Sequence, residues 1–300
     1  MDIRFFPKAM LAAIMLAGAF QANADTLYTF NSNQLAVIDT LNLGAVSYIN
    51  ISGLSQGERL LGVDLRPTDG LVYGITSANN LYTFNTTTGA ATLKTSLTGA
   101  SLAGQSVGID FNPSADFAGN PSLRVVTGTG NNYAVNADTG VIGNTANNIG
   151  NGYTAVAYTN SNPGVSPGAG DTTDLYYINT SSDSLNFLNT GFNSPATNGG
   201  IQNVGPLNVD VLSANGFDIL GNGKGYALFN LDNGTLDSQL FSINLTNGTA
   251  TYLTTLNGTF NGLTGVASVA SVPEPGSYAM LLAGLGMIAG VALRKSKQRV

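Results

Sequence analysis

An internal repeat constrains the fold of this chain more than any other feature. Two segments of fifteen residues, 71–85 and 175–189, align without a gap, and a third, 123–136, lies between them and is one residue shorter. The segments begin at residues 71, 123 and 175, which are 52 residues apart each time. A fixed period of this length indicates a protein in which each repeat is one supersecondary unit that packs against its neighbours.

Each repeat predicts a β-hairpin with one further strand on either side. The hairpins alternate apolar and polar residues, and Asn, Ser, Asp or Gly occupies the turn. More divergent copies begin at residues 27 and 225. We expect a strand after each hairpin, at residues 45–51, 91–97, 140–142, 200–204 and 250–256, and a strand before a hairpin at residues 61–65, 107–111, 154–158, 217–220 and 263–269.

Four strands repeated five times predict an all-β fold, a five-bladed β-propeller. The copy at residue 27 lacks a preceding strand, and residues 262–269 provide a strand with nothing after it. Pairing of these N- and C-terminal strands would complete one blade, close the ring and hide its edges. The alternative is a two-sheet β-sandwich, which gives no reason for a 52-residue period.

The N-terminus has the features of a secretory signal peptide over residues 1–24. Arg4 and Lys8 are followed by an apolar run of about twelve residues, and Ala22-Asn23-Ala24 is a small-x-small cleavage site. Signal peptidase is expected to cut between Ala24 and Asp25, leaving a propeller domain at residues 25–270. The alternative, an N-terminal membrane anchor, is disfavoured because the apolar run is too short to span a bilayer comfortably.

The composition of the body excludes several classes of function. Between Asp25 and Ser271 there are 5 basic and 15 acidic residues, a net charge of −10, so a nucleic-acid-binding role is excluded. The chain has no Cys and no His, which removes thiolate sites, Ser–His–Asp triads and the commonest general base. Glu58 is the one Glu of the body, so paired-Glu glycosidase chemistry is absent too. We therefore predict that the protein is not an enzyme.

Three aspartates are the candidate ligands for a metal ion. Asp64 and Asp110 end equivalent Gly-apolar-Asp segments, and Asp218 lies close to the same position of its repeat. Such strands would line the central channel of a propeller, where carboxylates could hold Ca²⁺. The alternative is that these side chains accept hydrogen bonds from loop amides and fix the blades. No other metal site, no catalytic residue and no cofactor is expected.

The C-terminal thirty residues have a different composition from the body. Residues 271–277 form a linker that contains Pro273, Glu274 and Pro275, and two prolines keep it extended. The apolar run 278–293 is just long enough for a transmembrane helix. The basic tail, residues 294–300, follows it and would stay in the cytoplasm while the body lies outside. Its basic residues are Arg294, Lys295, Lys297 and Arg299.

This order of Pro-Glu-Pro, Gly-containing apolar span and basic end resembles the PEP-CTERM sorting signal of Gram-negative bacteria. The resemblance implies that an exosortase reads Pro273, Glu274 and Pro275 and processes the chain at the inner membrane, and that the product goes to the cell surface or the extracellular space. It also implies an association with exopolysaccharide and biofilm. The body, notably residues 60–67 and 69–76, is similar to a family of secreted bacterial domains of unknown function.

The sequence therefore predicts an exported surface or matrix protein with a non-enzymatic structural or binding role, its partners being the processing enzymes and exopolysaccharide. A protein–protein adaptor would look the same in sequence. The alternative from another class is a Ca²⁺-dependent carbohydrate-active enzyme that uses the channel aspartates.

Overall fold

A computed structural model describes residues 24–144, 148–168, 171, 173–188 and 200–268, together with Gly284, Leu285 and Met287. The predicted signal peptide up to residue 23, the linker 271–277 and the basic tail 294–300 lie outside these residues. So does the predicted transmembrane helix, except for Gly284, Leu285 and Met287, which are helical. Within the described ranges, no helix has the length and apolar character needed to cross a membrane.

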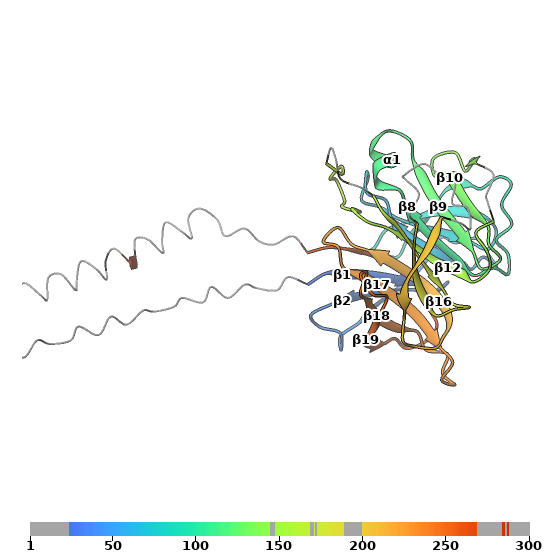
Figure 1. The fold of residues 1–300 in the computed structure, drawn as a ribbon. Coiled ribbons are helices and arrows are strands. Elements are labelled where there is room, and N and C mark those ends of the chain that lie inside the picture. The colour runs from blue at the N-terminus through green and yellow to red at the C-terminus, as the bar shows by residue number, and fades with distance from the viewer. Residues whose placement is uncertain are drawn as a thin grey trace, which may run out of the picture. The chain divides into compact units, whose positions relative to one another are not determined.

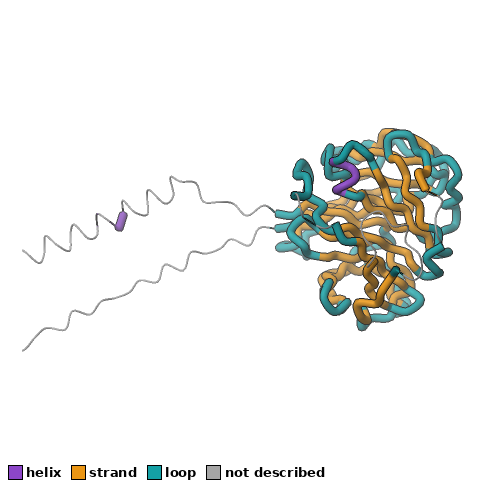
Figure 2. Tube along the Cα trace, turned by 45° about the horizontal axis from the view of Figure 1, so that its top comes forward, coloured by secondary structure: helices purple, strands orange, loops and turns teal. Residues whose placement is uncertain are grey.

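The described body is built from β-strands with loops at its periphery (Figure 2). The strands are β1 Thr26–Phe30, β2 Gln34–Asp39, β3 Ser47–Asn50, β4 Leu60–Leu65, β5 Val72–Thr76, β6 Asn80–Phe84, β7 Ala91–Ser96, β8 Val107–Phe111, β9 Ser122–Thr127, β10 Asn132–Asn136, β11 Ile142–Asn144, β12 Tyr153–Tyr158, β13 Leu175–Asn179, β14 Ser184–Leu188, β15 Ile201–Pro206, β16 Val211–Ile219, β17 Gly225–Leu231, β18 Gln239–Ile243, β19 Ala250–Thr255 and β20 Asn261–Val266.

These strands form five four-stranded antiparallel sheets, which are the five blades of a β-propeller. Blade 1 has the order β20-β1-β2-β3, and blades 2 to 5 are β4–β7, β8–β11, β12–β15 and β16–β19. The first strand of each sheet, β20, β4, β8, β12 and β16, contacts the first strand of the next blade, and β16 contacts β20 to complete the circle. The predicted five-bladed propeller is confirmed, and the β-sandwich alternative is wrong.

Blade 1 closes the ring with strands from both ends of the domain. β20 pairs antiparallel with β1, from Thr26 opposite Val266 to Phe30 opposite Asn261, and β1 then pairs with β2. Figure 1 shows β1 in blue beside strands from the C-terminal half of the domain. The closure predicted from the unpaired strands at the two ends is therefore correct, and the inner edges of all five sheets are covered.

The turn between the third and fourth strands has the same sequence pattern and conformation in several blades. Asn85 accepts hydrogen bonds at Oδ1 from the backbone N–H groups of Thr87 and Thr88, and Gly89 ends the turn with φ of 74°. A side chain at Gly89 would meet the backbone oxygen of Asn50 in the preceding blade. Only glycine fits both requirements. The same turn recurs at residues 136–140 and 244–248.

The core lies between the blades rather than on the propeller axis. Each of the five junctions between neighbouring blades holds its own cluster of buried apolar side chains. Between blades 2 and 3, for example, Tyr73 packs edge-on against Phe111 with ring centroids 5.2 Å apart. The outer strands are more exposed, as the burial pattern of β7 shows. Apolar burial therefore holds neighbouring blades together and leaves the inner strands free for polar contacts.

Several strand boundaries differ from those expected. β16 begins at Val211 instead of residue 217, because two register shifts, at Val211/Ser213 and Ala214/Gly216, break the alternation that would have revealed its first half. β11 spans Ile142–Asn144 instead of residues 140–142. The segment after β8 forms a one-turn helix, α1 Pro113–Phe117, which lies beside β8 and β9 (Figure 1). Asn112 caps it by accepting a hydrogen bond from Ala115 N.

Candidate functional site

Four of the five innermost strands carry a glycine two residues before a polar side chain. The pairs are Gly62 and Asp64, Gly108 and Asp110, Gly216 and Asp218, and Gly262 and Thr264. A Cβ atom placed on any of these four glycines would lie 2.3 to 3.3 Å from a backbone atom of the next blade. Glycine is therefore what allows the inner strands to approach one another so closely around the axis.

The polar side chain two residues later accepts a hydrogen bond from the next blade, always in the same direction around the ring. The four bonds are Phe111 N to Asp64 Oδ2 at 2.7 Å, Tyr158 N to Asp110 Oδ1 at 3.0 Å, Gly265 N to Asp218 Oδ2 at 2.8 Å and Leu65 N to Thr264 Oγ1 at 2.9 Å. The donors are strand amides rather than the loop amides expected from the sequence, and these hydrogen bonds tie each of these blades to the next.

The strand β12 departs from this pattern at both positions. Ala155 stands where the other inner strands have glycine, and Ala157 stands where they have Asp or Thr. Both alanines are buried in the apolar cluster between blades 4 and 5. An alanine side chain has no acceptor, so the ring of side-chain-to-backbone hydrogen bonds has one gap, at the junction between blades 4 and 5.

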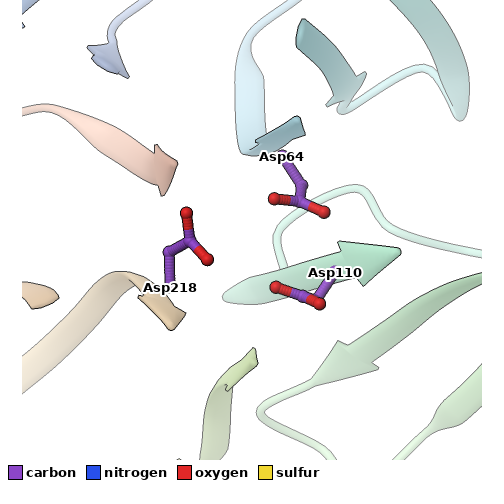
Figure 3. Close-up of side chains that lie close together, drawn as sticks. All are labelled: Asp64, Asp110 and Asp218. Carbon is purple, nitrogen blue, oxygen red and sulfur yellow. The ribbon is translucent and has the colours of Figure 1, made fainter. Parts of the chain in front are cut away.

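The three aspartates gather on the axis of the propeller. Asp64, Asp110 and Asp218 are 1 to 2% exposed, and one carboxylate oxygen of each lies within 4.8 Å of the others. Figure 3 shows the three carboxylates turned toward one another. Thr264 Oγ1 lies 3.0 Å from Asp64 Oδ1 and 3.1 Å from Asp218 Oδ2, but its single proton can be donated to only one of them at a time. The structure therefore brings together all three residues that the sequence singled out.

Burial and mutual repulsion disfavour the charged forms of these carboxyl groups. Burial raises the pKa of Asp64 well above its usual range, and the charge of Asp218 raises it further. The pKa of Asp110 rises for the same reasons, through burial and through Asp64 and Asp218. Burial raises the pKa of Asp218 to about 7, although hydrogen bonds from Thr264 and Gly265 act in the opposite direction. The cluster therefore requires either bound protons or a cation at neutral pH.

This arrangement suits a small ion far better than a substrate. Near the axis, the described strands enclose a void of only about 10 Å³, which has room for about one water molecule; it is lined by Gly62, Gly108, Gly216 and their neighbours and not by the three aspartates. Carboxylate and hydroxyl oxygens are the ligands that hard cations such as Ca²⁺ prefer. A polysaccharide chain, in contrast, has no access to these buried side chains.

A second polar network holds blades 2 and 3 together outside the axis. Arg66 donates from Nε and Nη2 to Asp116 Oδ1, at 2.9 and 2.8 Å, and from Nη1 to Asp138 Oδ1 at 3.0 Å. Asp116 is buried on α1, and Thr68 Oγ1 also donates to it. Because these partners occupy its carboxylate, Asp116 serves as an anchor for Arg66 rather than as a metal ligand.

An open hollow lies on the surface between blades 1 and 2. It has a volume of about 440 Å³ and is lined by the β1–β2 turn, the start of β4 and the residues around Thr259 and Asn261. Asn31, Asn33 and Arg59 contribute polar groups to it. Of the five basic side chains of the described body, Arg59 is the one for which neither an ion pair nor a side-chain hydrogen bond occurs. The hollow therefore combines amides with an uncommitted guanidinium group.

The predicted cleavage position lies at a buried point of the domain. Asp25 is fully buried, and its carboxylate accepts hydrogen bonds from Lys224 Nζ at 2.8 Å, Tyr226 OH at 2.9 Å, Asn222 Nδ2 at 2.9 Å and Ser268 N at 2.9 Å. These donors belong to blade 5 and to the residues after β20. Cleavage between Ala24 and Asp25 stays a prediction, as do the roles of the sorting residues 273–275 and the basic tail, which lie outside the described residues.

Comparison with known protein families identifies the body. A family model described as a domain of unknown function, DUF4394, matches residues 34–267. The chain belongs to the DUF4394 family. The match spans all but the first strand of this DUF4394 propeller, and it confirms the resemblance to a family of unknown function.

The tail matches a second model, the PEP-CTERM protein-sorting motif, over residues 271–297. The motif indicates that this DUF4394 protein is exported and that an exosortase processes it at the membrane. The sorting signal predicted from Pro273, Glu274 and Pro275 is thus confirmed as a PEP-CTERM motif.

No curated protein matches the chain. Among solved structures, TolB from Acinetobacter baumannii is similar over 80% of this chain, with 14% sequence identity and a TM-score of 0.44. The chain spans about half the length of that protein, 54% of it.

Sequence reasoning missed some members of the polar ring and the Arg66 network. Thr264 follows Gly262 as Asp64 follows Gly62, so a search for glycine followed two residues later by any acceptor would have found it. The same search places Asp218 at the equivalent position, not merely close to it. Arg66 and Asp116 are 50 residues apart, and nothing in the sequence pairs them before the blades are assembled.

Proposed function

We propose that this exported protein acts at the cell surface or in the extracellular matrix, where its propeller has a non-enzymatic role and binds acidic exopolysaccharide. Export and processing through the PEP-CTERM motif are the starting point. Proteins delivered in this way meet the polysaccharides outside the cell, so a glycan is the expected partner.

The observation that carries the proposal is the hollow that contains Arg59. Side-chain amides are suited to hydrogen bonding with sugar hydroxyls, and Asn31 and Asn33 line the hollow. Asn31 Oδ1 already accepts from Asn33 N and Gln34 N, and Thr259 Oγ1 donates to Leu236 O. Asn31 Nδ2, the Asn33 amide and an acceptor position of Thr259 Oγ1 are therefore the groups left for a sugar. A guanidinium group binds a carboxylate or sulfate with two parallel hydrogen bonds. Together these groups fit a sugar residue that carries a negative charge, such as a uronate.

The acidity of the rest of the body makes this binding depend on Arg59. With 5 basic and 15 acidic residues, the body repels polyanions at long range. Attraction is therefore confined to short distances. At contact, the guanidinium of Arg59 can bind the glycan because no ion pair within the described body occupies it. Neutral glycans would have only the hydrogen bonds and would bind more weakly.

The burial of the axial aspartates supports a non-enzymatic role. A general acid or base must come within hydrogen-bond reach of the substrate, and Asp64, Asp110 and Asp218 are enclosed by the inner strands. Glu58, the one Glu of the body, is engaged by Asn80 and Tyr82 at Oε1. These facts disfavour the alternative of a Ca²⁺-dependent carbohydrate-active enzyme.

A binding experiment tests the proposal. The exported protein and its Arg59→Gln variant are titrated with a polyuronate and with a neutral glucan, and affinity is measured by calorimetry. We expect wild-type protein to prefer the polyuronate, and Arg59→Gln to lose at least about tenfold in affinity, since a charge-assisted hydrogen bond contributes about 1.5–3 kcal/mol. Lys94→Gln removes the same charge from β7, far along the blade from the hollow, and is the matched control. Equal affinity of both variants for the polyuronate would refute a role for Arg59.

A further inference from the structure

The three axial carboxylates have no basic partner. In the described part of the chain, neither a Lys nor an Arg hydrogen bonds or ion-pairs with Asp64, Asp110 or Asp218; their partners are backbone amides and the hydroxyl of Thr264. Like charges enclosed at this distance are strongly unfavourable without compensation. A positive charge supplied from outside the protein would compensate them.

One carboxylate oxygen of the cluster is buried without a hydrogen-bond partner. Asp110 Oδ1 accepts the hydrogen bond from Tyr158 N, but Asp110 Oδ2 is buried and has no hydrogen-bond partner. Buried carboxylate oxygens are nearly always satisfied, so one without a hydrogen-bond partner points to another kind of ligand, such as a cation. Figure 3 shows the Asp110 carboxylate facing those of Asp64 and Asp218.

The spacing of the oxygen atoms is compatible with a Ca²⁺ ion bound between them. Three points that lie within 4.8 Å of one another have a common centre no farther than about 2.8 Å from each, which is close to the Ca²⁺–oxygen distances of about 2.3–2.6 Å. Mg²⁺ requires about 2.0–2.1 Å and an octahedral shell that retains several waters. Ca²⁺ accepts longer bonds and irregular coordination, so three carboxylates held at these distances favour it over Mg²⁺.

The backbone holds these carboxylates in place before any ion arrives. Each aspartate comes from the inner strand of a different blade and is fixed by a backbone N–H of the blade that follows. The ligands are therefore already ordered, and binding costs little further side-chain entropy.

We propose that Asp64, Asp110 and Asp218 bind one Ca²⁺ ion on the propeller axis, where it ties blades 2, 3 and 5 together. This inference stands apart from the proposed glycan binding, because it concerns the axis and not the surface hollow. The ion is a structural element that the protein acquires after export, in the compartment where extracellular modules bind Ca²⁺ at about 10⁻⁴–10⁻³ M.

The test uses the exported protein purified from the producing cells. Equilibrium dialysis against 10 mM CaCl₂, followed by mass spectrometry of the metal content, is expected to show one bound calcium per chain. After treatment with a chelator, CaCl₂ is titrated in by calorimetry and the melting temperature Tm is followed. At about one hundred times the dissociation constant, we expect Tm to rise by about 5–10 °C, with less than half that shift for MgCl₂. No heat and no Tm shift at 10 mM Ca²⁺, or an equal shift with Mg²⁺, would overturn the assignment.

Two variants separate the axial site from other carboxylates. Asp110→Asn keeps an oxygen for Tyr158 N but replaces one charged ligand, so Ca²⁺ affinity should fall at least tenfold while the calcium-free protein melts no lower than wild type. Asp183→Asn makes the same change at a carboxyl that also accepts one backbone hydrogen bond, from Val211 N, outside the cluster. It should bind Ca²⁺ as wild type does. Undiminished Ca²⁺ binding by Asp110→Asn would contradict the proposed ligand set; if that variant does not fold, the calcium content of wild-type protein decides.

Discussion

The close approach of the inner strands can be tested at Gly108. A Cβ atom at this position would lie 2.6 Å from Ala155 Cα and 2.9 Å from Thr154 O, both on β12. Ordinary van der Waals contact begins at 3.4 Å, so the gap is about 1 Å too small for a methyl group. The obstacle is the backbone of β12, and it cannot rotate away as a side chain would. Gly108→Ala should therefore force β8 and β12 apart.

Three contributions determine how much this separation changes the free energy of unfolding. Overpacking in a well-packed interior costs about 1–3 kcal/mol. The hydrogen bond from Tyr158 N to Asp110 Oδ1, now 3.0 Å, would be stretched beyond bonding distance, and a buried bond of this kind contributes about 1–3 kcal/mol. Alanine also restricts the conformations of the unfolded chain, which stabilises the folded state by about 0.4–1 kcal/mol. The free energy of unfolding should fall by about 1–6 kcal/mol, and the middle value of about 3 kcal/mol lowers Tm by about 6–12 °C for a domain of this size.

Calorimetry or circular dichroism on the exported protein measures this effect, and Gly44→Ala is the matched control. Gly44 has no heavy atom within 4 Å of an added Cβ and does not adopt a left-handed conformation. Its replacement should leave Tm unchanged or raise it slightly. If Gly108→Ala melts within 1 °C of wild type, glycine is not what sets the distance between β8 and β12.

Two further predictions concern the ends of the domain. Burial opposes ionisation of Asp25, but hydrogen bonds from Lys224, Ser268 and Tyr226 outweigh this effect and lower the pKa of Asp25. The ionised form therefore stabilises the fold above about pH 4. This contribution is lost as the pH falls through the lowered pKa. Asp25→Asn should cost about 1–3 kcal/mol in urea unfolding at pH 7 and much less at pH 3, and an equal difference at both pH values would contradict this. Replacing Pro273, Glu274 and Pro275 by alanine should keep the full-length chain in the membrane fraction, whereas unchanged size and location on fractionation would argue against processing by an exosortase.

The propeller could be predicted from sequence because the residues that specify each repeated hairpin and turn lie close together in the chain. Each hairpin encodes its own turn, and Asn85 with Gly89 shows that the side chain and the positive φ are both specified within five residues. The closure of the ring followed from one unmatched strand at each end. The start of β16 could not be predicted, because its two bulges remove the alternation on which the prediction depends.

The axial site was only partly predictable. The Gly-apolar-Asp segments identified the residues, but whether Asp64, Asp110 and Asp218 meet depends on the number of blades and on the distance between them. That distance is set by glycines, whose effect is visible only when the neighbouring backbone is in place. The partner of Arg66 is likewise chosen by packing, since Asp116 comes within 2.8 Å only after blades 2 and 3 have assembled.

The pairing of β20 with β1 has a mechanical consequence for a protein that is processed at its C-terminus. The chain leaves the domain after Ser268, directly behind the innermost strand of blade 1. A pull on that end loads β20, which has β1 on one side and the inner strands of blades 2 and 5 on the other. An outer strand such as β3 could be peeled away one hydrogen bond at a time. β20 can be withdrawn only by separating it from β1 and from the inner strands of blades 2 and 5, so the chain leaves the domain from a strand that resists extraction.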